Sequence, residues 1–172
     1  MTKHNDFIEQ LTEIATVSGF WSLSCDELAE GLDLLIERVF RQPNFALKSV
    51  VDSLFEHQGP LAERSVKMKL LLGLGVISAE LYHDLTCFFE HRTSLADDTL
   101  SFSSEPFLAA AQQLHSADLS LIDELRRQLE KTDAAHTMQR QMLQLRLERM
   151  VRSSLILAVV AMLEQLDSDS PL

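Results

Sequence analysis

LLLGLGVISAELYHDL, residues Leu70 to Leu85, predicts two helices joined by a turn that carries glycine. Gly75 lies where a residue in the left-handed conformation would end the first helix. Ser78 is a good N-cap for the second helix. The same pattern is found in DNA-reading helix-turn-helix motifs and in helical hairpins inside bundles, so charge and side-chain size must separate the two.

The second helix of this pair is poorly suited to DNA. It carries Glu80, Asp84 and Glu90, which would face or approach phosphates, and has a single Arg92 at its far end. The usual motif has a small residue four positions before the turn glycine and an apolar residue nine positions after it, where this chain has Leu71 and Asp84. We therefore interpret the segment as a helical hairpin inside an acidic bundle.

Composition favours helices over sheets. The 172 residues are 46% hydrophobic and include only 5 Gly and 4 Pro, with few of the turn residues that sheet proteins need. This content is enough for a sizeable core in one domain. We predict an all-α fold in which residues 1–172 form a single-domain bundle of about seven or eight helices with a long C-terminal helix.

Apolar residues recur at helical spacing along most of the chain. The expected helices cover residues 5–16, 24–41, 43–57, 61–74, 78–95, 104–114, 118–132 and 134–166. Gly19-Phe20-Trp21 is expected to break the first two, and Ser24 with Glu27 forms a capping box for the second. The polar segment Ala96 to Ser104 predicts a long loop and is our candidate for the mobile part of the molecule.

The last expected helix is the longest. Residues 134–166 contain no Gly or Pro, which corresponds to a helix of about 50 Å. The segment Leu155 to Leu163 is apolar on nearly every face, as expected for a central helix surrounded by others. These nine residues are too few to span a membrane, which takes about 20.

The cysteines and the first residues favour a reducing compartment. Cys25 and Cys87 form no CxxC pair and lie in apolar helical patterns, which predicts buried free thiols. MTKHNDFIEQ is polar where a signal peptide would be apolar. We therefore expect a cytoplasmic protein.

The sequence contains no motif of a common enzyme or metal site. Six histidines are present, at His4, His57, His83, His91, His115 and His136, without HExxH, a Cys/His cluster or an acidic cage. GxSxG, P-loop and GxGxxG patterns are also absent. We predict no catalytic, cofactor or metal site, and interpret the histidines as surface or boundary residues.

Positive charge is concentrated in one segment of an acidic chain. The formal net charge is -11, but residues 126–152 hold seven Lys/Arg against three Asp/Glu. Arg146, Arg149 and Arg152 are spaced by three and follow one side of the last helix, with Arg140 somewhat out of line. One interpretation is a solvated face that pairs with acidic neighbours. The other makes these four arginines a binding site for an acidic partner, a phosphorylated protein or nucleic acid.

The run from Val39 to Leu85 resembles the mannitol operon repressor family. The resemblance is carried by Val39-Phe40-Arg41, Ala46 with Lys48, Gly59-Pro60-Leu61, Ser65-Val66, Lys69-Leu70, Gly73-Leu74-Gly75-Val76-Ile77, Tyr82 and Asp84, and more weakly by Val151-Arg152-Ser153-Ser154. The region from Ala96 to Gln139 matches poorly. The resemblance implies an all-helical cytoplasmic regulator that represses mannitol uptake and utilisation genes and has no recognised DNA-binding motif.

The resemblance and the acidic charge together favour indirect repression. Our leading hypothesis is docking on a protein partner, either a DNA-bound regulator or a component of the sugar phosphotransferase system. One alternative is direct DNA binding by the basic stretch Arg126 to Arg152 of a dimer. Another is a small-molecule sensor or enzyme with a pocket beneath the Ala96 to Ser104 loop. Met138 and Met142 could also pack against a second copy, so a homodimer stays open.

Overall fold

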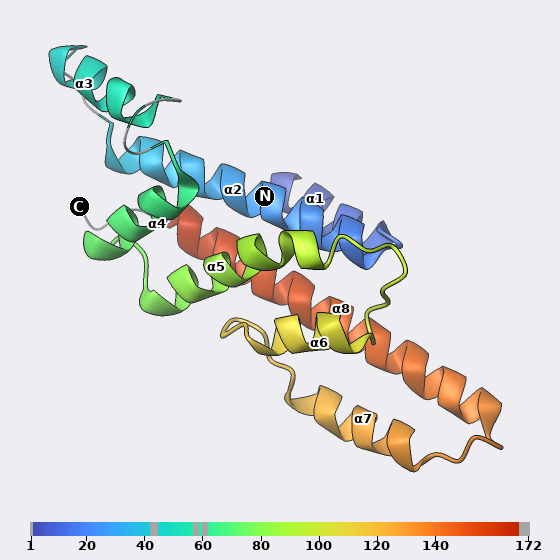
Figure 1. Cartoon of the computed structure of the whole chain (residues 1–172). Helices are drawn as coiled ribbons and strands as arrows, with labels where there is room; N and C mark the ends of the chain where they lie inside the picture. The colour runs from blue at the N-terminus through green and yellow to red at the C-terminus, as the bar shows by residue number, and fades with distance from the viewer. Residues whose placement is uncertain (1, 42–44, 57–58, 60–61, 169–172) are drawn as a thin grey trace.

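The computed structural model describes residues 2–41, 45–56, 59 and 62–168, and this part of the chain folds into eight α-helices without a strand (Figure 1). The helices are α1 (Thr2–Glu13), α2 (Val17–Val39), α3 (Phe45–Phe55), α4 (Arg64–Gly73), α5 (Ala79–Ser94), α6 (Glu105–Gln112), α7 (Ser120–Lys131) and α8 (Thr137–Asp167). The predicted all-α class with a long last helix is confirmed. Pro43, His57, Pro60 and Leu61, which bounded expected helices, lie outside the described residues.

The two longest helices, α2 and α8, pack together and run in the same direction (Figure 1). Near their ends Arg38 donates to the backbone carbonyl oxygens of Leu166 and Asp167. Further back, Gly31 lets the two helices approach, since a Cβ there would lie 3.3 Å from Cδ1 of Leu166 and 3.4 Å from Cδ2 of Leu163. This pair is the frame on which α1 and α5 pack.

Helix α2 corrects the expected break at Gly19-Phe20-Trp21. The helix begins earlier, at Val17, because the Thr16 hydroxyl accepts a hydrogen bond from the Gly19 amide at 3.1 Å and caps it. Phe20 and Trp21 are fully buried, so their packing outweighs the weak helix propensity of glycine. Ser24 caps nothing and donates to the Phe20 carbonyl inside the helix. Correspondingly, α1 ends at Glu13 and not near Thr16.

Aromatic side chains from four parts of the chain form the centre of the core. Trp21 stacks on Phe88 with ring centroids 4.4 Å apart, and its Nε1 donates to the Phe88 carbonyl at 2.9 Å. Phe102 meets Phe20 and Phe107 edge to face at 5.4 and 5.3 Å. The segment from 96 to 104 is a loop, as predicted, but Phe102 anchors it in the core. The polar composition of the segment gave no indication that Phe102 would be buried.

The α4–α5 hairpin confirms the expected turn. Gly75 has φ +70°, the Val76 amide donates to the Leu71 carbonyl at 2.9 Å, and the Ser78 hydroxyl accepts from the Leu81 amide at 3.1 Å. Leu71 is buried, so the first helix of the hairpin meets the bundle through a large apolar residue. The segment is a core hairpin, because both of its helices contribute to the same hydrophobic cluster.

Helix α8 has two different halves. Its first half extends past the rest of the bundle and is accompanied by α7, while α3 lies at the opposite end of the molecule (Figure 1). In the second half Leu155, Val159 and Met162 are buried, but Leu157 is 70% exposed. The expectation of a helix surrounded on all sides is therefore wrong, since one face of this half meets solvent. Among the described residues, no helix combines the length and apolarity needed to cross a membrane.

Candidate functional site

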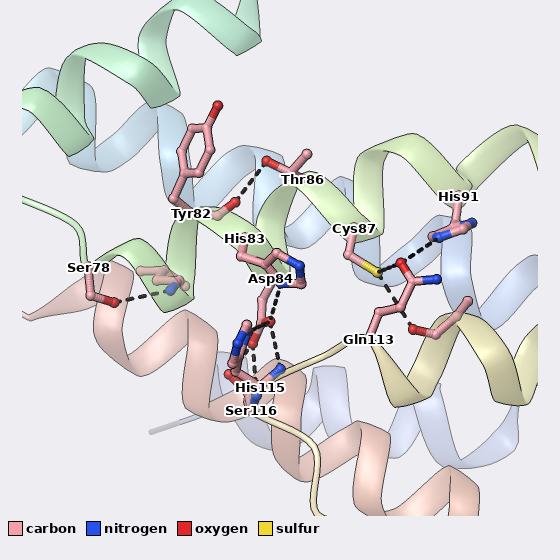
Figure 2. Close-up of polar contacts among 12 residues, drawn as sticks. Ser78, Tyr82, His83, Asp84, Thr86, Cys87, His91, Gln113, His115 and Ser116 are labelled. Atoms are coloured by element: carbon pink, nitrogen blue, oxygen red, sulfur yellow. Dashed lines mark hydrogen bonds and ion pairs between the residues drawn. The ribbon is translucent and has the colours of Figure 1, made fainter.

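A buried carboxylate links α5 to the turn that follows α6. Asp84 is fully buried, and Figure 2 shows it pointing toward His115 and Ser116. It accepts hydrogen bonds from the Ser116 amide at 2.8 Å, the Ser116 hydroxyl at 2.6 Å and the His115 amide at 2.8 Å. The sequence argument against DNA reading placed Asp84 on the surface of a hypothetical reading helix, whereas in the structure its side chain points inward.

Hydrogen bonds keep this carboxylate charged despite its burial. Burial by itself would raise the pKa of Asp84, but the donors from Ser116 and His115 stabilise the anion and bring the pKa below its usual value. The group is therefore ionised at neutral pH. A fixed negative charge inside the fold attracts cationic or donating groups that can reach it.

Two imidazoles border this carboxylate. Nδ1 of His83 lies 3.4 Å and Nδ1 of His115 lies 3.3 Å from the same Asp84 oxygen, Oδ1. The two rings stand edge to face with centroids 4.6 Å apart, and each side chain is about half exposed, at 49% and 50%. Sequence spacing missed this cluster because 31 residues separate Asp84 from His115. The available signal was a carboxylate at the position where the helix-turn-helix motif has an apolar residue.

The thiols are confirmed as buried and free. Burial raises the pKa of Cys25 to about 12 and that of Cys87 to about 11. Cys25 donates to the Phe88 carbonyl at 3.2 Å, and Cys87 lies beside the Ala110 carbonyl at 3.6 Å. Neither forms the thiolate that nucleophilic chemistry requires at neutral pH.

The four arginines singled out from the sequence fall into two pairs. Arg140 donates to the Thr132 carbonyl at 2.9 Å and closes the α7–α8 hairpin. Arg152 donates to the Thr12 carbonyl at 2.6 Å, and its guanidinium lies 4.2 Å from the centre of the Phe102 ring. Arg146 and Arg149 are exposed, and within the described ranges no contact to another charged group is seen for either. Arg146 and Arg149 are therefore the pair that is free to face a partner in solvent.

Exposed apolar side chains lie beside these two arginines. Met138 is 76% exposed, Met142 67% and Leu145 54%. At 100° per residue these three positions share one side of α8, Arg149 falls on the same side and Arg146 lies next to it. We call the set Met138, Met142, Leu145, Arg146 and Arg149 the outer face of α8. It belongs to the half of the helix that extends past the bundle.

Two hollows in the described surface lie away from the 96–104 loop. A groove of about 1130 Å³ between α2 and α3 is bordered by Phe40, Phe55 and Lys67 among others. A smaller hollow of about 400 Å³ lies between α4 and α5, beside Tyr82 and Phe89. No residue of the loop lines either of them, so they do not provide the pocket expected beneath it.

Comparison with known proteins assigns the fold to a family. A family model described as the mannitol repressor matches residues 3–167. The chain belongs to the mannitol repressor family. The mannitol operon repressor of Escherichia coli K12 is 34% identical over 113 residues, which cover 64% of this chain. They cover 58% of that relative, so the match spans less than two thirds of its length.

Solved structures extend the mannitol repressor likeness over almost the whole chain. The X-ray structure of the MtlR-HPr complex from Escherichia coli matches with a TM-score of 0.83 and 27% identity, covering 98% of this chain and 100% of that one. A crystal structure of YggD from Shigella flexneri, described as a possible transcriptional regulator, matches with a TM-score of 0.71 and 23% identity, covering 95% and 98%. The second likeness concerns the fold alone.

Proposed function

We propose that the protein is a cytoplasmic, non-enzymatic repressor of mannitol uptake and utilisation genes that acts by binding a protein partner, HPr of the sugar phosphotransferase system. The observation that carries the proposal is the likeness, over 98% of the chain, to a repressor solved in complex with HPr. The sequence identity to a mannitol operon repressor supports the proposal that mannitol genes are the ones repressed. The acidic charge of -11 supports an indirect mechanism, because it repels the DNA backbone.

The outer face of α8 is the surface that we assign to the partner. Apolar side chains that are mostly exposed in the chain can be buried by a partner, and flexible methionines adapt to its shape. Arg146 and Arg149 add positive charge to an otherwise acidic molecule, which favours an acidic patch on the partner and sets its orientation. Arg140 and Arg152 bind backbone carbonyls within the chain, so we assign them a positioning role, Arg140 near the start of α8 and Arg152 near its middle.

Direct binding to DNA has weaker support. Of the arginines between 126 and 152, Arg126 pairs with Glu105 at 2.7 Å and Arg127 lies 3.7 Å from Glu124. Arg140 and Arg152 bind backbone carbonyls, as described above. Each phosphate contact needs a basic group, so a DNA duplex would have to be held mainly by Lys131, Arg146 and Arg149.

The test compares two charge-reversed variants. Arg146→Glu with Arg149→Glu should weaken binding of purified HPr by about tenfold or more in isothermal titration calorimetry, because two attractive charges become repulsive. Arg41→Glu with Lys48→Glu makes the same charge change on exposed residues at the other end of the molecule and should leave the affinity unchanged.

Three outcomes contradict parts of this proposal. Equal affinity of both variants would remove the outer face of α8 as the contact surface. Absence of HPr binding by the unaltered protein would remove HPr as the partner. A sequence-selective shift of mannitol-promoter DNA by the purified protein alone, at physiological salt, would remove the indirect mechanism.

A further inference from the structure

More hydrogen-bond donors surround the Asp84 carboxylate than its two oxygens can accept. Its two oxygens offer about four positions for donors. Three are taken by the Ser116 amide, the Ser116 hydroxyl and the His115 amide. The imidazoles of His83 and His115 both approach Oδ1, where one position is left. Hydrogen bonding cannot satisfy both rings well at this oxygen.

The two distances from imidazole nitrogen to the Asp84 oxygen are long for hydrogen bonds and fit two ligand atoms of one metal ion. N–H···O bonds centre on about 2.9–3.0 Å, and both Nδ1 to Oδ1 distances, 3.4 and 3.3 Å, are longer. A tetrahedral ion with bonds of about 2.0–2.1 Å separates its ligand atoms by about 3.3–3.4 Å. One ligand atom from each of the three residues lies within 4.8 Å of the others.

We propose that His83, Asp84 and His115 form a binding site for a divalent transition-metal ion of the zinc type. Two imidazole nitrogens and one carboxylate oxygen are donors that such ions prefer, and solvent would complete the fourth position. The half-exposed rings leave a path from solvent to the site. Ser116 supplies the outer hydrogen bonds that orient a metal-binding carboxylate.

The ion would connect two parts of the fold. His83 and Asp84 belong to α5, whereas His115 lies in the turn between α6 and α7. An ion held by all three would fix that turn against α5 and stabilise the folded chain over the unfolded one, which lacks the assembled site.

The experiment uses the full chain without a polyhistidine tag and stripped by a chelator. Titration calorimetry with zinc chloride should show one saturable site per chain, and zinc should raise the melting temperature. His83→Ala and His115→Ala should each weaken zinc binding by about tenfold or more. Magnesium should not bind, because it prefers oxygen ligands in octahedral geometry.

The controls separate this site from adventitious histidine binding. His4→Ala with His136→Ala removes two histidines elsewhere and should leave zinc affinity unchanged. Both cluster variants remove half-exposed side chains and keep the His115 amide that binds Asp84, so the fold should persist. Unchanged zinc affinity in the His83→Ala, His115→Ala double variant would overturn the proposal, as would the lack of saturable zinc binding by the unaltered chain.

Discussion

The aromatic centre of the bundle and the outer face of α8 use apolar side chains in opposite ways. In the centre, Trp21 and Phe88 are shielded from solvent, and the indole nitrogen has a hydrogen-bond partner. On the outer face, Met138 and Met142 are mostly exposed. Rigid rings in fixed contacts define one native structure, whereas flexible thioethers on a surface contribute little to it. The comparison predicts that substitutions in the two regions will have separable effects on folding and on binding.

The largest expected effect is in the aromatic centre. Trp21→Ala removes the stacking on Phe88 and the hydrogen bond to its carbonyl, and leaves a cavity between α2 and α5. We expect a loss of about 3–5 kcal/mol in the free energy of unfolding, measured by urea denaturation followed by circular dichroism. A loss below 1 kcal/mol, about the value for a surface site, would show that this centre does not define the fold.

An intermediate effect is expected at Asp84. Asp84→Asn removes the charge and leaves some of the donors of Ser116 and His115 without a good acceptor. We expect a loss of about 1–3 kcal/mol in the free energy of unfolding at neutral pH. Asp98→Asn, which alters an exposed carboxylate in the 96–104 loop, is the matched control and should change stability by under about 0.5 kcal/mol.

The same carboxylate gives this prediction a pH dependence. The pKa of Asp84 is lower in the folded chain than its usual value, so its ionised form is stabilised by folding. That contribution is complete above the unfolded pKa and is lost as pH falls through the folded pKa. The stability difference between the unaltered chain and Asp84→Asn should therefore narrow as the pH is lowered below the usual carboxyl range, and a constant difference would contradict this account.

The smallest effect on folding is expected on the outer face of α8. Met138→Ser with Met142→Ser removes side chains that are 76% and 67% exposed, so the free energy of unfolding should change by about 0.5 kcal/mol or less. Binding of HPr should weaken, because its apolar contact is lost. Leu157→Ser, at a 70% exposed position on the other half of α8, is the control that should alter neither. Unchanged HPr binding by the methionine variant would confine the contact to the arginines.

Local signals in the sequence predicted what depends on local physics. The turn glycine Gly75 and the cap Ser78 behave as expected, because a left-handed residue and a capping hydroxyl act on their immediate neighbours. The continuation of α2 through Gly19 depends on burial against α5 and α6, which local spacing does not contain. The contact between His115 and Asp84 could not be predicted either, because it depends on how the turn after α6 packs against α5. Helical spacing singled out Arg146 and Arg149 together with Arg140 and Arg152, but it could not show that the latter two bind backbone carbonyls of distant residues.

The parallel packing of α2 and α8 also determines when the fold can be completed. Arg38 and Asp167, which meet at the end of this pair, are 129 positions apart in the chain. During synthesis the side of α2 that packs on α8 therefore stays uncovered until the last helix has been made. Such distant contacts slow folding and leave hydrophobic surface open to aggregation or to chaperones. Chains that stop before α8 should be recovered mainly as insoluble or chaperone-bound material.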